Sequence, residues 1–216
     1  MSEASITPLS GDLARLVQWW SNRADNRART VGHIDLEGLE GAEGEDVDFT
    51  AQVDRAIDSG ASLVCIYGQP ADVSVQAAIA TQTGVNAASM IEQSAGMSDL
   101  QWMRTVAEIR DARSTAVSDD RIASLAAALL RCSERRTPVL FDGPFAHAAA
   151  LYAANSDDQA LSWWLPVSSS TDHAIREVQD KLELTPALNL QLDGTGDSGV
   201  RAVLALLAEF ETAEAD

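Results

Sequence analysis

Short apolar runs alternate with longer amphipathic stretches along this 216-residue chain. Residues 61–67 and 137–141 are almost uninterrupted apolar runs, which is typical of strands buried on both faces of a parallel sheet. A third short apolar run spans residues 161–167, and residues 186–192 fit either a strand or an extended segment. The pattern therefore predicts a sheet built mainly from short parallel strands.

The stretches between these runs carry apolar residues at helical spacing. Gly60 follows one of them and suits the left-handed cap of a helix, while Ser98 precedes another and suits an N-cap. Because helices alternate with strands, we expect an α/β layered fold with a mainly parallel sheet flanked by helices. The predicted helices span residues 11–23, 49–59, 73–83, 99–112, 119–132, 145–154, 173–182 and 200–210.

The chain divides into two parts by composition. Residues 1–48 are expected to hold an N-terminal helix and an acidic connector, because residues 32–48 are rich in Gly, Glu and Asp and lack periodicity. Residues 49–216 are expected to form the α/β domain. The acidic tail, residues 211–216, is expected to fray.

The formal net charge of −18 disfavours nucleic acid and anionic membranes as partners. The longest apolar stretch is far short of the roughly 20 residues that cross a bilayer. The N-terminus lacks the basic and apolar regions of a secretory signal, and Cys65 and Cys132 lie far apart among apolar neighbours. We therefore expect a cytoplasmic protein with buried free thiols.

The three histidines lie in separate segments without metal-ligand spacing, so we expect neither a metal nor a cofactor. His147 falls within an Ala-rich helix and is expected to be partly buried with its hydrogen bonds satisfied. For His173, the preceding Thr171 or Asp172 is expected to start a helix.

Chemistry in such folds gathers beyond the carboxyl ends of the strands. Three loops qualify: residues 68–72, residues 142–144, and the Gly-rich turn of residues 193–199. Glycines before a helix N-terminus leave N–H groups free to bind an anion. Two carboxylates in the last loop, Asp193 and Asp197, oppose phosphate binding.

Three segments together resemble one known family. Residues 138–151 contain a strand, an Asp142-Gly143 pair and an Ala-rich helix; residues 182–190 lead into the Gly-rich turn and a Leu/Ala helix; residues 61–68 precede another Ala-rich helix. This order resembles the nicotinate-nucleotide:dimethylbenzimidazole phosphoribosyltransferases of cobalamin assembly, over about residues 49–207. The resemblance implies a substrate site at Gly68, Gln69, Asp142, Gly143, Gly194, Thr195, Gly196 and Ser198.

The motifs of that family are altered here. Its Gly/Asn/Thr-rich phosphate loop is replaced by residues 69–76, which include Pro70 and Asp72. Its catalytic Glu is absent: ungapped spacing places Gly196 there, next to Asp197, and matching the glycines places Asp193 there. The family's SHRS-like stretch is shortened to residues 168–171. The chain is also much shorter than a full member, with the missing part expected before about Arg29.

Two hypotheses follow from the resemblance. The chain is a catalytically degenerate member that serves as a binding or partner protein in cobalamin assembly, or it is an active transferase with Asp193 or Asp197 as general base. A third hypothesis is an unrelated acidic interaction module. For the first two we expect a small aromatic base or nucleotide as ligand. We also expect a homodimer, because family members are commonly dimers and Trp19, Trp20, Trp102, Trp163 and Trp164 offer apolar area.

Overall fold

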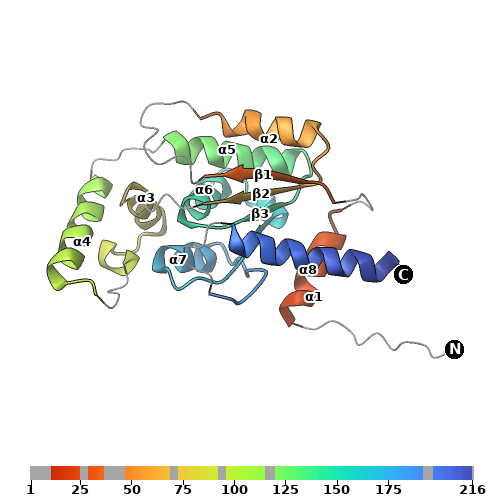
Figure 1. The fold of residues 1–216 in the computed structure, drawn as a ribbon. Helices are drawn as coiled ribbons and strands as arrows, with labels where there is room; N and C mark the ends of the chain where they lie inside the picture. The colour runs from red at the N-terminus through yellow and green to blue at the C-terminus, as the bar shows by residue number, and fades with distance from the viewer. Residues whose placement is uncertain are drawn as a thin grey trace.

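A parallel sheet lies at the centre of the molecule (Figure 1). The computed structural model describes residues 11–24, 29–36, 47–68, 73–91, 96–114, 120–191 and 197–215. Within them, the strands β1 (Val31–Asp35), β2 (Leu63–Tyr67), β3 (Val139–Phe141) and β4 (Trp164–Pro166) follow one another in this order, all parallel. β2 and β3 are parallel neighbours, which confirms that the apolar runs at residues 61–67 and 137–141 contain strands of a parallel sheet.

Beyond β4 the sheet continues only as an isolated parallel bridge between Ser168 and Leu188. The described part of the segment at residues 186–192, residues 186–191, therefore runs beside the sheet with a single bridge. Its extended form was one of the two outcomes that the sequence allowed.

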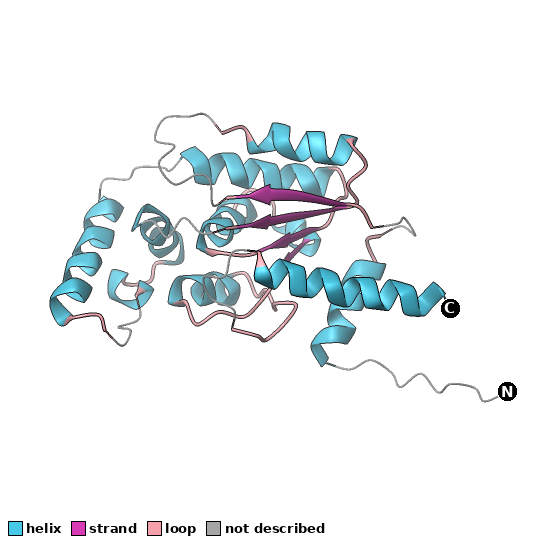
Figure 2. Cartoon of the chain, in the orientation of Figure 1, coloured by secondary structure: helices cyan, strands magenta, loops and turns pink. Residues whose placement is uncertain are grey.

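Helices cover both faces of the sheet (Figure 2). One face carries Val64, Ile66, Val139 and Phe141, which share a large core with α2, α5 and α6. The other face carries Leu63, Cys65 and Leu140 and is covered by α1 and α8. The helices are α1 (Gly11–Ser21), α2 (Phe49–Asp58), α3 (Val73–Thr83), α4 (Asp99–Ser114), α5 (Asp120–Glu134), α6 (Pro144–Ala154), α7 (His173–Lys181) and α8 (Ser198–Ala215), with short 3₁₀ turns η2 (Ala87–Met90) and η3 (Asp158–Trp163).

Polar side chains start several helices. Ser98 Oγ accepts a hydrogen bond from the backbone N–H of Gln101 at the start of α4, as the sequence predicted. Asp172 accepts from Ala174 N at the start of α7, which confirms the helix-start role expected there. Gly60 follows α2 at φ +103°, in the left-handed region that favours glycine.

The predicted connector at residues 32–48 is wrong at its beginning, because β1 occupies residues 31–35 and pairs with β2. Only Ile34 is fully buried in this edge strand, so the apolar pattern is too weak to reveal it. Gly32 is needed for packing, since a Cβ there would lie 2.8 Å from Ala56 Cβ of α2. β1 thus belongs to the same sheet as the residues after 49.

The last helix was predicted to end at residue 210, whereas α8 continues through residues 211–215. Glu211 explains the extension, because its carboxylate accepts a hydrogen bond of 3.0 Å from Trp20 Nε1 and pairs with Arg29 at 3.5 Å. These contacts hold the end of α8 against α1 and the start of β1.

Among the described helices, none combines the length and the apolar character that a membrane-spanning helix requires.

Candidate functional site

The carboxyl ends of β2, β3 and β4 meet at one edge of the sheet, where we expect a site. Gly68 follows β2 at φ +111°, a left-handed conformation that favours glycine. Asp142 follows β3, and its backbone N–H donates to Ile66 O at 2.9 Å. Ser168, just beyond β4, is buried. The structure therefore brings the predicted residues Gly68, Asp142 and Gly143 to one edge.

The carboxylate of Asp142 lies at the starts of two helices. Its Oδ1 accepts a hydrogen bond of 2.9 Å from the backbone N–H of Gly143, the N-cap of α6. Its Oδ2 faces the first turn of α8, because a Cβ on Gly199 would lie only 2.8 Å from it. Helix N-termini carry partial positive charge and favour an anion. At this edge the chain's own carboxylate takes that place.

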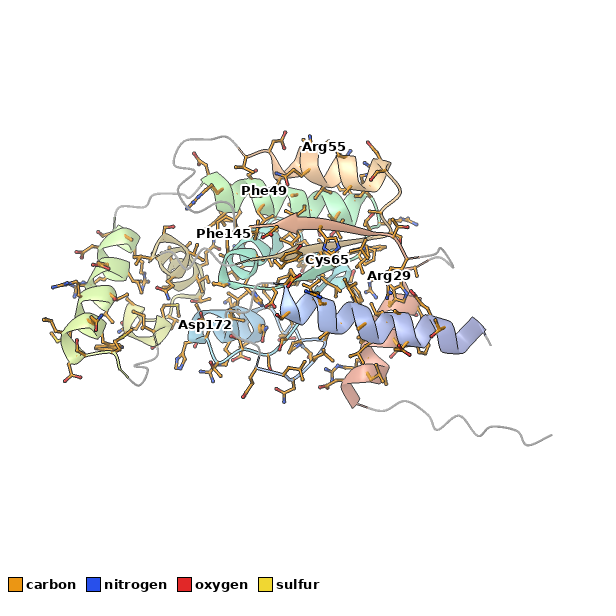
Figure 3. The ribbon with its side chains drawn as sticks, in the orientation of Figure 1. Arg29, Phe49, Arg55, Cys65, Phe145 and Asp172 are labelled. Atoms are coloured by element: carbon orange, nitrogen blue, oxygen red, sulfur yellow. The ribbon has the colours of Figure 1, made fainter. Side chains whose placement is uncertain are left out.

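The turn between β3 and α6 is determined by Asp142, Gly143 and Pro144. Gly143 adopts φ +87°, and Pro144 occupies the first turn of the helix, where its missing N–H costs nothing. Phe145 and most of the Ala-rich helix are then buried against the sheet, whereas Tyr152 is exposed (Figure 3). The Asp142-Gly143 pair, which is part of the family resemblance, thus forms the turn between β3 and α6. This turn places the Asp142 carboxylate next to the start of α8.

A buried hydrogen-bonded network lies behind this junction. His147 Nδ1 is 2.7 Å from Gly143 O, so Nδ1 carries the proton, and Nε2 accepts from Gln179 Nε2 at 3.1 Å. Gln179 Nε2 also donates to Ser168 O at 3.2 Å. Burial lowers the pKa of His147 from 6.5 to about 4, against the opposing effect of its hydrogen bond to Gly143. The histidine is neutral and satisfied, as expected, and its burial is complete rather than partial.

The remaining predicted residues differ in how the structure places them. Asp197 precedes α8, and its Oδ2 lies 3.8 Å from Arg201 Nη1, with 44% of the Asp197 side chain exposed. Ser198 is the first residue of α8 and is exposed. Five other predicted residues lie outside the described residues: Gln69, Asp193, Gly194, Thr195 and Gly196. The same holds for Pro70 and Asp72.

Two features of the edge are not evident from the sequence. Gly199 belongs to a Gly-rich turn in the sequence, although it is the residue whose missing side chain lets α8 approach Asp142 and Val167. Gln179 lies near the end of α7, and nothing in its spacing connects it with His147, 32 residues earlier. The glycine in the first turn of a helix was the one available signal for close approach.

Other reactive groups in the described part of the chain are buried or dispersed. Cys65 and Cys132 are free and buried, which confirms that expectation, and burial raises the pKa of both thiols to about 12. No group of three or more His, Cys, Asp or Glu residues that could hold a metal occurs among the described residues. Among the described residues of this edge, Asp142 is the carboxylate that lies against the first turns of both α6 and α8.

Comparison with solved structures supports the fold. The crystal structure of CobT from Thermus thermophilus superimposes with a TM-score of 0.62 at 21% identity, over 74% of this chain and 52% of that chain. At this level of identity the likeness concerns the fold.

Comparison of sequences gives the family. A family model described as phosphoribosyltransferase (DBI_PRT) matches residues 50–209. The nicotinate-nucleotide–dimethylbenzimidazole phosphoribosyltransferase of Streptomyces avermitilis is 33% identical over 82% of this chain and 52% of its own length. The enzyme of the same name from Streptomyces coelicolor is 31% identical over 85% of this chain and 59% of its own length. The chain thus spans about half the length of these relatives, and it belongs to the nicotinate-nucleotide–dimethylbenzimidazole phosphoribosyltransferase family.

Proposed function

We propose that this chain is a binding protein of cobalamin assembly that holds an aromatic base at the carboxyl edge of its sheet and does not transfer phosphoribose. The observation that carries the proposal is the position of Asp142. Its carboxylate faces Gly199 at the start of α8 and accepts from Gly143 N at the start of α6.

This arrangement disfavours a phosphate at the same place. The relatives are named for a nicotinate nucleotide, which carries a phosphate that several N–H donors would have to bind. At about 4 Å and an effective dielectric constant near 20, one contact between like charges costs roughly 4 kcal/mol. Asp142 would impose such a cost on a phosphate at the start of α8. The replacement of the family's phosphate loop by a segment with Pro70 and Asp72 acts in the same direction.

The family's catalytic Glu is absent from the sequence, and Asp193 and Asp197 are the carboxylates nearest to its place. A general base must come within hydrogen-bond reach of the proton that it removes. Asp197 is instead directed along the exposed first turn of α8, beside Arg201. Asp193, the other sequence candidate, is one methylene shorter than the family's Glu.

An uncharged aromatic base suits the same edge. A ring N–H of a benzimidazole can donate a hydrogen bond to the Asp142 carboxylate, and hydrogen bonds to ionised groups contribute about 1.5–3 kcal/mol. We propose that Gly68, Gln69, Gly143 and Ser198 frame the ring, with Gly194, Thr195 and Gly196 contributed by the turn before α8. Gly68 and Gly143 let the backbone approach a flat ring closely.

Calorimetric titration with 5,6-dimethylbenzimidazole tests this proposal. We expect binding by the wild-type chain, and binding weakened by about 10- to 100-fold in Asp142→Asn, which follows from the hydrogen-bond energy above. Asp158→Asn is the matched control, because it removes one exposed carboxylate in η3 and should bind like the wild type. Absence of binding, or equal affinity of Asp142→Asn and wild type, would overturn the proposal.

A homodimer is also part of the proposal, on the family resemblance alone. The tryptophans that suggested an interface are used inside the chain: Trp20 and Trp164 are buried, and Trp102 Nε1 donates to Ile91 O. Light scattering at high micromolar concentration checks the expectation, and a monomer there would contradict it.

A further inference from the structure

A cavity of about 510 Å³ opens on another part of the molecule. Its walls come from α1, from residues 169–171 after β4, from α7, and from the segment at residues 184–191. It shares no residue with the predicted substrate site at Gly68, Asp142, Gly143 and Ser198. The volume is within the usual range for small-molecule sites.

Gln179 presents a fixed acceptor to this cavity. Its side chain lines the cavity, yet only 7% of the residue is exposed. The amide nitrogen is committed to two acceptors, His147 Nε2 and Ser168 O, and these fix the orientation of the amide group. Oε1 then has no hydrogen-bond partner among the described residues, and it is not sealed from solvent. A ligand in the cavity can satisfy it with an O–H or N–H.

Asn189, on the segment at residues 184–191, presents a donor to the cavity. Ser169 Oγ accepts from Gln191 N and donates to Asn189 Oδ1 at 2.6 Å, so the Asn189 amide oxygen is used. Its Nδ2 group has no partner within the described part of the chain. The cavity therefore offers an acceptor on α7 and a donor on the segment at 184–191. A molecule with neighbouring hydroxyl groups satisfies both, because each hydroxyl donates and accepts.

Four charged residues line the cavity, two of each sign. Arg15 is bound to Asp12 at 3.0 Å and to Pro186 O at 3.0 Å. Arg176 and Asp180 lie four residues apart on α7, and no ion pair joins them in the described part of the chain. The formal charges of these four residues sum to zero, although the net charge of the whole chain is −18. The cavity thus selects neither an anion nor a cation.

Among the described residues, the rest of the lining consists of hydroxyl and amide side chains with two apolar residues, Leu184 and Pro186, and no aromatic ring. This composition does not provide a stacking surface for an aromatic base. We propose that the cavity is a binding site for an uncharged polyhydroxylated molecule, a sugar or sugar alcohol, held between Gln179 Oε1 and Asn189 Nδ2. This inference does not depend on the function proposed for the Asp142 edge.

Nuclear magnetic resonance of the full chain tests the site with D-ribose, D-glucose and ribitol as neutral probes and ribose 5-phosphate as the anionic counterpart. We expect at least one neutral probe to shift the side-chain amide signals of both Gln179 and Asn189. Asn189 is exposed, so Asn189→Ala should fold normally and weaken that binding about tenfold, as expected for one lost hydrogen bond. Asn155→Ala is the matched control, since Asn155 is exposed, bonds to Gln82 and does not line the cavity.

Equal affinity of Asn155→Ala and wild type, with the loss confined to Asn189→Ala, supports the proposal. The proposal is overturned if no neutral probe shifts these signals. It is likewise overturned if Asn189→Ala binds as tightly as wild type, or if only ribose 5-phosphate binds.

Discussion

The Asp142 carboxylate stands directly against Gly199: a Cβ on Gly199 would lie 2.8 Å from Asp142 Oδ2 and 2.8 Å from Val167 Cγ1. Real Cβ atoms do not approach their neighbours so closely, and both neighbours are held by the sheet. The first turn of α8 is therefore seated on the ends of β3 and β4. This contact links the candidate site to the stability of the fold.

Gly199→Ala is expected to destabilise the chain by about 1–3 kcal/mol through overpacking, despite the better helix propensity of alanine. Urea unfolding measures the change. Ser198→Ala, on the exposed neighbouring position, should stay within roughly 0.5 kcal/mol of wild type. In a Val167→Ala background, Gly199→Ala should cost less stability than it does in the wild type, because one of the two close neighbours has been removed. A neutral or stabilising Gly199→Ala would contradict the contact.

The buried His147 predicts a pH dependence of stability. Its pKa is lowered from 6.5 to about 4 in the folded chain, so the unfolded chain binds the proton more readily. The free energy of unfolding is therefore unaffected by this histidine above about pH 6.5. It falls as the pH is lowered toward 4, by up to about 3 kcal/mol. Urea unfolding at several pH values in this window measures it.

His147→Gln should flatten the pH dependence in that window. An unchanged slope in His147→Gln would show that other groups cause the dependence. Nitrogen chemical shifts provide a second check, since the geometry predicts a neutral ring protonated at Nδ1.

The two cysteines should be inert in the folded chain. Burial raises the pKa of Cys65 and of Cys132 to about 12, and the thiolate is the reactive form. A thiol reagent such as dithionitrobenzoate at mildly alkaline pH should react no faster than the chain unfolds. Both thiols should react at once in guanidinium chloride. Rapid reaction of either thiol in the native chain would contradict the burial of that residue.

Arg23 lies over two tryptophan rings, 5.3 Å from the Trp19 centroid and 5.8 Å from the Trp163 centroid. It also donates to Trp19 O at 2.9 Å, and its contact with the Trp163 ring connects the end of α1 to η3. Arg23→Gln is expected to cost about 1–2 kcal/mol and to change tryptophan fluorescence. Arg104→Gln, on an exposed position of α4, removes the same charge and should leave both stability and fluorescence unchanged.

The sequence predicted the central strands and most helices because their patterns are strong. Residues 63–67 are buried on both faces of the sheet, and a short apolar run between glycines is typical of such a strand. β1 was missed because an edge strand needs few apolar residues, and its Gly32 serves packing against Ala56. The end of α8 was missed because Glu211 binds Trp20, a contact between residues 191 positions apart.

The site was predictable only where chain position determines geometry. Asp142 and Gly68 end neighbouring strands, so any parallel sheet with this order brings them together. The meeting of Asp142 with Gly199 depends on how α8 docks, and the bond between His147 and Gln179 depends on how α7 packs against α6. Such tertiary contacts leave no periodic trace in the sequence.

The most direct test of the proposed function is a chromatographic assay for α-ribazole phosphate. Purified chain is incubated with nicotinate mononucleotide and 5,6-dimethylbenzimidazole. Loss of a general base alone lowers such a rate by on the order of 10²- to 10⁴-fold, and the repulsion of the phosphate lowers it further, so we expect no detectable product. Product formation that Asp193→Ala or Asp197→Ala abolishes would contradict the account and identify that aspartate as the base.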